Sequence, residues 1–155
     1  MTTTELRREL AARGLSYELI PHRHTERATD EAAVIGVRPD EVGKTLVLTS
    51  PEGFVRAVLP ASDRLDLHKV REYLGAGKEI RLATEEELVG AYPAFELGAV
   101  PPFGGPPGDR VIVDRRIAEH ETIVLEAGNH EESVKIRVAD LLSLANAELA
   151  DVCVD

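Results

Sequence analysis

The segment from Gly98 to Gly108 constrains the fold most strongly, because it contains four of the nine prolines and four of the twelve glycines. Proline fixes φ and has no N–H to donate, whereas glycine opens backbone conformations that other residues avoid. The segment therefore predicts a stiff loop in which peptide groups can approach a bound molecule closely. The composition alone leaves two interpretations open, a plain connection between elements or the backbone wall of a site.

Hydrophobic periodicity and turn residues on both sides of this loop predict short elements of both kinds. Thr2 with Glu5 and Thr84 with Glu87 match capping boxes, and Asp66 is a good N-cap. The expected helices are 3–13, 30–35, 67–74, 85–92 and 139–147, and the expected strands are 16–20, 43–49, 54–59, 79–82, 110–113, 122–126 and 133–138. Since strands come in hairpins with helices scattered between them, we expect an α+β fold with a mixed, largely antiparallel, β-barrel-like sheet and surrounding helices.

Length and charge restrict the classes of function. A chain of 155 residues without an internal repeat or dividing boundary predicts a single domain over residues 1–155. The net charge of −10 argues against non-specific nucleic-acid binding but leaves room for a small local phosphate site. A single cysteine fits a reducing compartment, and no segment has the apolar length of a membrane span. We therefore expect a cytoplasmic protein without a membrane partner.

Side chains with recognisable catalytic spacing are scarce. His22 and His24 have the spacing of two metal ligands, but no third ligand is recognisable, so an exposed loop is the preferred interpretation. No serine lies in a nucleophile-elbow sequence, and Cys153 lies near the C-terminus. We expect no metal and no cofactor, and a covalent triad is poorly supported.

Lys44 stands apart because it follows Gly43 at the start of the most apolar predicted strand. One interpretation is a solvated lysine at a strand edge. The other is a fixed cation at the rim of a pocket, which would bind a phosphate or stabilise developing negative charge. An ordinary lysine has a pKa near 10.4, so it would not act as a base at neutral pH.

Several sequence pieces in this order resemble one family. They are Val42-Gly43-Lys44-Thr45-Leu46-Val47, Leu65-Asp66-Leu67-His68-Lys69-Val70 with Leu74-Gly75-Ala76, Gly98-Ala99-Val100-Pro101-Pro102-Phe103-Gly104, and Glu126-Ala127-Gly128 with Ala139-Asp140-Leu141-Leu142. Together they resemble the YbaK/ProX family, the prolyl-tRNA editing-domain-like aminoacyl-tRNA deacylases. The resemblance covers essentially the whole chain.

The resemblance implies hydrolysis of the ester that links a wrong amino acid, Ala or Cys, to the 3′ end of tRNA-Pro. It also implies prolyl-tRNA synthetase as a partner. Lys44, Gly98 and Pro102 correspond to the family's catalytic lysine and G-x-x-x-P motif. The resemblance further implies a set of residues that line the substrate cleft: Tyr17, Thr45, Ala99, Val100, Pro101, Phe103, Glu126, Ala127 and Gly128.

This chemistry agrees with the residues. An aminoacyl ester is already activated, so a positioned water and a stabilised oxyanion suffice without a nucleophilic side chain. Glu126 stands where some members of the family carry a small polar residue. Two alternatives to the deacylase stay open at this point: a non-catalytic module that binds aminoacyl-tRNA or a synthetase, and an esterase for another small acyl ester.

Overall fold

The computed structural model describes residues 3–77, 79–104 and 109–155, without the side chains of residues 3–5. The predicted capping box of Thr2 and Glu5 and the end of the predicted loop, 105–108, lie outside this description. The strands are β1 (Tyr17–Pro21), β2 (Val42–Ser50), β3 (Gly53–Pro60), β4 (Arg81–Leu82), β5 (Arg110–Asp114), β6 (Thr122–Glu126), β7 (Glu132–Arg137) and β8 (Glu148–Ala150). The helices are α1 (Thr3–Ala12), α2 (Ala28–Ile35), α3 (Leu67–Leu74), α4 (Glu85–Ala91) and α5 (Val138–Leu144), with single 3-10 turns at Pro39–Glu41 and Ile117–Glu119.

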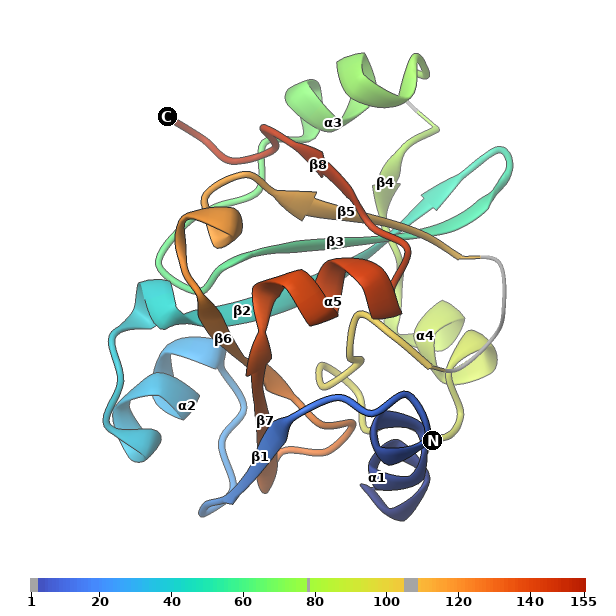
Figure 1. Ribbon diagram of the computed structural model, residues 1–155. Coiled ribbons are helices and arrows are strands. Elements are labelled where there is room, and N and C mark those ends of the chain that lie inside the picture. The colour runs from blue at the N-terminus through green and yellow to red at the C-terminus, as the bar shows by residue number, and fades with distance from the viewer. Residues whose placement is uncertain (1–2, 78, 105–108) are drawn as a thin grey trace.

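The strands form one mixed sheet in the order β1-β7-β6-β2-β3-β5-β8, with β4 paired to β2. The pairings β1–β7, β6–β7, β2–β3 and β2–β4 are antiparallel, and β2–β6, β3–β5 and β5–β8 are parallel. The sheet curves strongly, so that β6 and β7 run across the direction of β3 and β5 (Figure 1). This confirms the expected α+β class with a mixed, largely antiparallel sheet.

Local sequence signals account for most element boundaries. Asp66 caps α3 by accepting hydrogen bonds from the backbone N–H groups of His68 and Lys69. Thr84 and Glu87 form the predicted capping box at the start of α4. The predicted turn after β2 is a hairpin in which Ser50 lies opposite Gly53 and Lys44 opposite Leu59.

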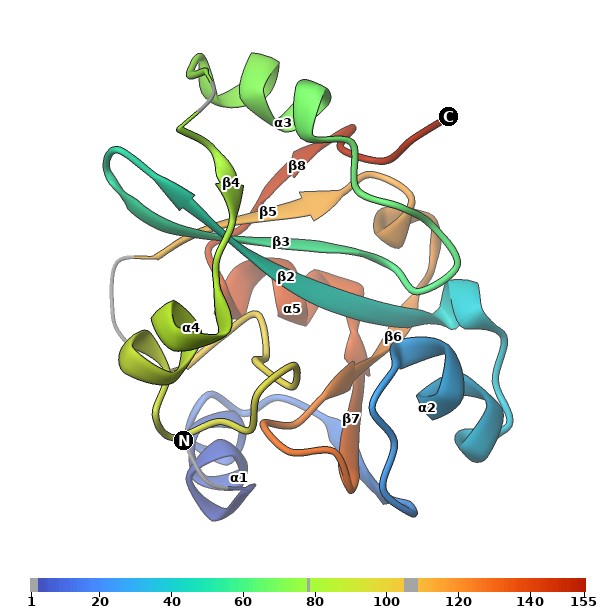
Figure 2. The same ribbon diagram turned by 180° about the vertical axis from the view of Figure 1, so that it is seen from behind.

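Helices cover both faces of the sheet. Strand β3 is buried on both faces, because Val58 packs with Leu141 of α5 in the largest apolar cluster while Val55 and Ala57 pack with Val70 of α3 in a second one. Helix α5 crosses the concave side, α3 covers the end near β8, and α1 and α2 lie beside the β6–β7 half (Figures 1 and 2).

The C-terminal region departs from expectation. The predicted helix 139–147 is shorter, Val138–Leu144, and Glu148–Ala150 form β8, which pairs in parallel with β5. The segment Glu-Leu-Ala has no β-branched residue, so its sequence carries no strand signal. A strand forms there because β5 offers an unpaired edge, and the buried Asp114 carboxylate accepts a hydrogen bond from the Val152 N–H just beyond β8.

Candidate functional site

Lys44 is held in place near the start of β2. Its side chain is half-buried, and its Nζ donates a hydrogen bond to the Asp63 carbonyl oxygen at 2.5 Å. Desolvation lowers the pKa of Lys44 from its ordinary value. Neighbouring Gly43 leaves no room for a side chain, since a Cβ there would lie 2.8 Å from a methyl carbon of Leu125. The ammonium is therefore a positioned cation, and close packing of β2 on β6 fixes the strand that carries it.

The predicted loop begins at Gly98, whose φ of +82° suits glycine and few other residues. A Cβ on Gly98 would lie at an ordinary van der Waals distance, 3.5 Å, from Cε1 of His130, so the imidazole is a neighbour of the loop backbone. Residues 99–103 (Ala99, Val100, Pro101, Pro102 and Phe103) are all buried. The described part of the loop is therefore a packed wall of the molecule rather than an extended linker.

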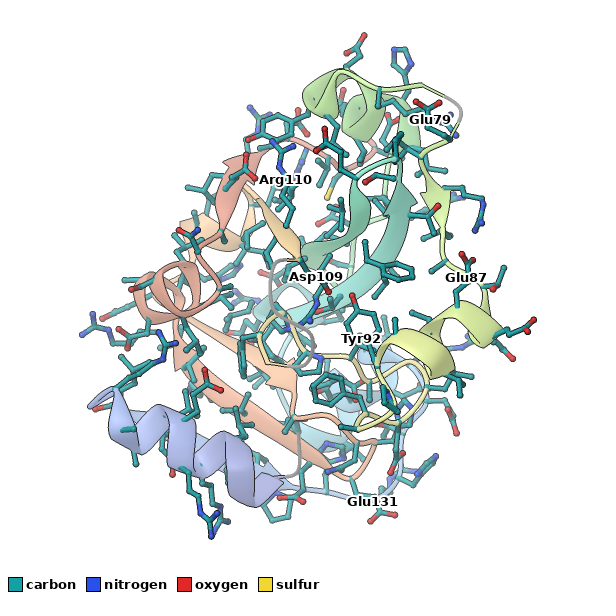
Figure 3. All side chains as sticks on the ribbon, turned by 90° about the vertical axis from the view of Figure 1, so that its right-hand side faces the viewer. Glu79, Glu87, Tyr92, Asp109, Arg110 and Glu131 are labelled. Atoms are coloured by element: carbon teal, nitrogen blue, oxygen red, sulfur yellow. The ribbon has the colours of Figure 1, made fainter. Side chains whose placement is uncertain are left out.

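A buried arginine that the sequence analysis did not single out holds the far end of the loop. Arg56 of β3 is 2% exposed, and its guanidinium donates to the carbonyl oxygens of Pro101 at 2.9 Å and Gly104 at 2.7 Å. It also forms a salt bridge with Asp109 at 3.2 Å. The Tyr92 hydroxyl donates to the same carboxylate (Figure 3), and the guanidinium lies over the Tyr92 ring, 4.8 Å from its centroid. A single planar fork thus fixes two peptide groups of the loop.

Lys44 and the loop meet in a cavity of about 300 Å³. Five of the predicted site residues line it: Lys44, Thr45, Gly98, Val100 and Glu126. The remaining lining residues, which the sequence analysis did not predict, are Glu26, Arg27, Ala28, Thr29, Leu46 and Ala61. Most of these precede or begin α2, a segment that reads as an ordinary polar loop in the sequence.

Other predicted site residues lie away from the cavity lining. Tyr17 pairs with Ile136 across β1 and β7 and packs against the largest apolar cluster, and the residues that line the cavity do not include it. Phe103 and Ala127 belong to the same cluster. Pro101 and Pro102 are buried behind the loop surface with Ala99, and Gly128 accepts the Glu96 N–H at 2.9 Å. The residues that line the cavity do not include them.

Glu126, at the end of β6, is the most deeply buried acidic group lining the cavity, with 11% of its side chain exposed. Burial, reinforced by the charges of Glu31, Glu96 and Glu26, raises the pKa of Glu126 to about 9. Its Oε2 lies 3.6 Å from Nδ1 of His130. The cavity therefore contains a carboxyl group that is protonated at neutral pH.

Behind Glu126 lies a second buried carboxyl group, Glu31 of α2, which is 0% exposed. The Ser133 hydroxyl is hydrogen-bonded to one oxygen of Glu31 and lies 2.8 Å from Nε2 of His22. The other Glu31 oxygen has no hydrogen-bond partner among the described residues. Burial raises the pKa of Glu31 to about 7, so this group is only partly ionised at neutral pH.

A larger depression of about 520 Å³ lies elsewhere, around the β2–β3 turn. Glu79 and Arg110 line it, at the end of the molecule away from Glu131 in the β6–β7 turn (Figure 3). It contains none of the predicted site residues and no buried ionisable group. The volume of a depression therefore does not identify the site. The smaller cavity is the better candidate because Lys44 and Glu126 line it.

Neither a metal site nor a membrane-spanning helix is found in the described ranges. No group of three or more His, Cys, Asp or Glu residues there could hold a metal ion. His22 instead lies beside Ser133, and His24 is hydrogen-bonded to Glu26 at 2.6 Å. Within the same ranges, no helix is both long and apolar enough to cross a membrane.

Known proteins resemble this chain over most of its length. The chain is 26% identical over 150 residues to the multifunctional Ser/Thr-tRNA deacylase ProXp-y of Escherichia coli (strain K12), covering 92% of this chain and 87% of that protein. It is 34% identical over 128 residues to the proline–tRNA ligase of Shouchella clausii (strain KSM-K16), covering 77% of this chain and 22% of the ligase. The match to the ligase thus spans about a fifth of that protein.

Solved structures show the same fold. A structure described as a candidate trans-editing enzyme for prolyl tRNA synthetase superposes with a TM-score of 0.88 at 23% identity, covering 99% of this chain and 97% of that chain. A hypothetical protein named APE2540 gives a TM-score of 0.88 at 27% identity, covering 97% and 99%. The sequence profile of the aminoacyl-tRNA editing domain matches residues 22–144, which include Lys44, the loop and Glu126. The protein belongs to the aminoacyl-tRNA editing domain family.

Proposed function

We propose that this protein is a hydrolase that cleaves the ester between a mischarged small amino acid and the 3′ end of a tRNA. The observation that carries the proposal is the cavity where Lys44, Gly98 and Glu126 meet, in a chain of the aminoacyl-tRNA editing family. Such an ester is already activated, so a site that positions water and stabilises negative charge accelerates hydrolysis without a nucleophilic side chain.

In this proposal, Lys44 and the loop have separate roles. Lys44 contacts the terminal adenosine or its phosphate through its positioned ammonium, and its positive charge favours an oxyanion nearby. The backbone of Gly98–Pro102 cradles the aminoacyl group and orients the attacking water. The hydrogen bonds of Arg56 to Pro101 and Gly104 support this role, because they hold the loop backbone rigid before any substrate binds.

The proposed substrate is a small amino acid, Ala or Cys, on tRNA-Pro. A cavity of about 300 Å³ between rigid walls leaves little room for a large side chain. The proline–tRNA ligase among the relatives supports tRNA-Pro, whereas the name of the Escherichia coli relative points to Ser and Thr. With a net charge of −10, the surface attracts tRNA weakly, so prolyl-tRNA synthetase is proposed as the partner that delivers it.

The test is a deacylation assay with labelled Ala-, Cys-, Ser-, Thr- and Pro-tRNA, comparing the natural protein with Lys44→Ala. We expect release of a small amino acid faster than in buffer, and a loss of roughly 100-fold or more in Lys44→Ala, as for removal of other charge-stabilising groups. Lys135→Ala is the matched control, since Lys135 on β7 lines a different depression. It should keep full activity.

Three outcomes would contradict the proposal. No ester cleaved faster than in buffer, with or without prolyl-tRNA synthetase, would exclude the hydrolase. Full activity in Lys44→Ala would exclude the role given to Lys44. Tight, salt-sensitive binding of tRNA without turnover would instead indicate a non-catalytic binding module.

A further inference from the structure

The cavity carries charges of both signs. Lys44 and Arg27 contribute cationic groups to its lining, and Glu26 and Glu126 contribute carboxyl groups. An aminoacyl nucleotide is dipolar in the same sense, because it carries a phosphate on one side of the ester and an α-ammonium on the other. Lys44 already has a role towards the nucleotide in the proposed function, but the carboxyl groups have none.

Glu126 lacks a strong cationic partner. Within the described part of the chain, its only ion-pair contact is His130, at 3.6 Å, and no Lys or Arg pairs with it. Nε2 of His130 lies 2.6 Å from the Leu97 carbonyl oxygen, which can only accept, so Nε2 carries the hydrogen. In the neutral ring, Nδ1 then presents a lone pair towards Glu126, and this buried atom has no hydrogen-bond partner.

The surroundings of Glu126 favour a cation. After burial, the charges of Glu31, Glu96 and Glu26 raise its pKa, and these residues come from the segment that enters α2 and from the segment before Gly98. No Lys or Arg among the described residues pairs with Glu126, so burial and the negative potential of these groups keep its carboxyl group protonated. A bound ammonium would reverse this preference by stabilising the carboxylate.

We infer that Glu126 binds the α-ammonium of the aminoacyl group, so that the site selects esters with a free amine over neutral acyl esters. This inference rests on the proposed function and names the group recognised in the same cavity. The α-ammonium supplies the positive charge that no lysine or arginine of the described residues supplies to Glu126. It forms a charge-assisted hydrogen bond with the carboxylate inside the cavity. The carboxylate is thus a substrate-binding group and a determinant of specificity.

The experiment compares alanyl-tRNA with lactyl-tRNA, in which a hydroxyl replaces the ammonium at nearly the same size. Each enzymatic kcat/KM is divided by the rate of hydrolysis in buffer, because the two esters differ in intrinsic reactivity. We expect the natural protein to prefer alanyl-tRNA by roughly tenfold or more, the scale of one charge-assisted contact. Glu126→Gln and Glu126→Ser should each bring this ratio close to one. Glu52→Gln, at the exposed tip of the β2–β3 hairpin, removes the same charge elsewhere and should leave the ratio unchanged.

A second readout follows the proton. At pH 7, binding of a non-hydrolysable alanyl-amide analogue of the terminal adenosine should release close to one proton, as Glu126 ionises against the ammonium. Calorimetry in buffers of different ionisation enthalpy measures this release, and the lactyl-amide analogue should release none. Equal normalised hydrolysis of both esters by the natural protein, or a preference unchanged in both Glu126 variants, would overturn the inference while the deacylase stands. Hydrolysis of neither ester would refute the proposed function instead.

Discussion

Two buried polar clusters hold the two ends of the loop at 96–104, and they differ in how well their groups are paired. At the far end, the guanidinium of Arg56 contacts Pro101, Gly104 and Asp109, and Asp109 also accepts from Tyr92. At the near end, His130 donates to Leu97, but its other ring nitrogen and one oxygen of Glu31 have no hydrogen-bond partner among the described residues.

The difference separates a structural cluster from a functional one. Buried charges are tolerated when opposite charges and hydrogen bonds compensate them, as they do around Arg56. Around Glu126, like charges gather without a matching cation, which costs stability in the free protein. Sites that bind a charged ligand commonly keep such uncompensated groups, and the ligand supplies the missing charge. Mutations in the two clusters should therefore change stability in opposite directions.

The largest expected effect is that of Arg56→Met. The apolar side chain fills a similar volume but removes the cation that pairs with Asp109 and the donor to two loop carbonyl groups. Breaking a buried pair from one side costs about 3 to 5 kcal/mol in the free energy of unfolding. Denaturant unfolding followed by circular dichroism measures the loss, and deacylation should fall with it because the loop is no longer held.

Arg110→Met is the matched control for that change. Arg110 pairs with Glu148 at 2.6 Å on the surface, with 42% of its side chain exposed. An exposed pair contributes about 1 kcal/mol or less, so this variant should unfold almost as the natural protein does. An equal loss in the free energy of unfolding in both arginine variants would show that the buried Arg56 pair contributes no more to stability than the exposed Arg110 pair.

An opposite effect is expected for Glu31→Gln. Glu31 ionises at a pKa of about 7 in the folded protein and near its ordinary value of 4.5 when unfolded, so the folded state binds the proton more tightly. Stability from this group is fully present below pH 4.5 and is lost as pH rises through 7. Glutamine avoids the ionisation, so the free energy of unfolding of the variant should exceed that of the natural protein by about 3 kcal/mol at pH 8.

The same comparison at pH 5 provides the control for Glu31→Gln. There the folded carboxyl is protonated in the natural protein, so glutamine should bring little gain. Denaturant unfolding at both pH values gives the two differences. If Glu31→Gln is less stable than the natural protein at pH 8, or is stabilised equally at both pH values, then ionisation of Glu31 does not destabilise the folded protein.

The smallest effect is expected for Tyr92→Phe. Burial and the hydrogen bond to Asp109 raise the pKa of Tyr92 to about 12, so the hydroxyl stays a donor at all ordinary pH values. Losing one donor while Arg56 still pairs the carboxylate should cost about 1 to 2 kcal/mol in unfolding. A loss as large as that of Arg56→Met would mean that the tyrosine, not the arginine, carries the cluster.

The sequence predicted the fold well where local signals decide it. The boundaries of α3 follow from Asp66 at one end and Gly75 at the other, and the β2–β3 hairpin follows from the turn at Ser50–Gly53. Strand β8 could not be predicted, because its three residues have no strand pattern and it forms only against the edge of β5. Tertiary pairing, rather than local preference, creates that element.

For the site, the sequence predicted two residues that line the cavity but not the buried charged residues around them. Lys44 and Gly98 were predicted and line one cavity. Arg56 was not, although a lone arginine in an otherwise apolar strand is a usable signal, because its loop partners lie about 45 residues further along the chain. Glu31 could not be recognised either, since a glutamate beside Asp30 in the first turn of a short helix is expected to be exposed, whereas in the fold it is buried and hydrogen-bonded to Ser133.

The central claim is that the cavity between Lys44 and Glu126 holds the aminoacyl end of tRNA. The most direct measurement is a crystal structure with the alanyl-amide analogue of the terminal adenosine. We expect the analogue in this cavity, with its α-ammonium within hydrogen-bond distance of Glu126 and its nucleotide against Lys44. Binding in the larger depression beside Arg110, or in this cavity with the ammonium turned away from Glu126, would contradict it.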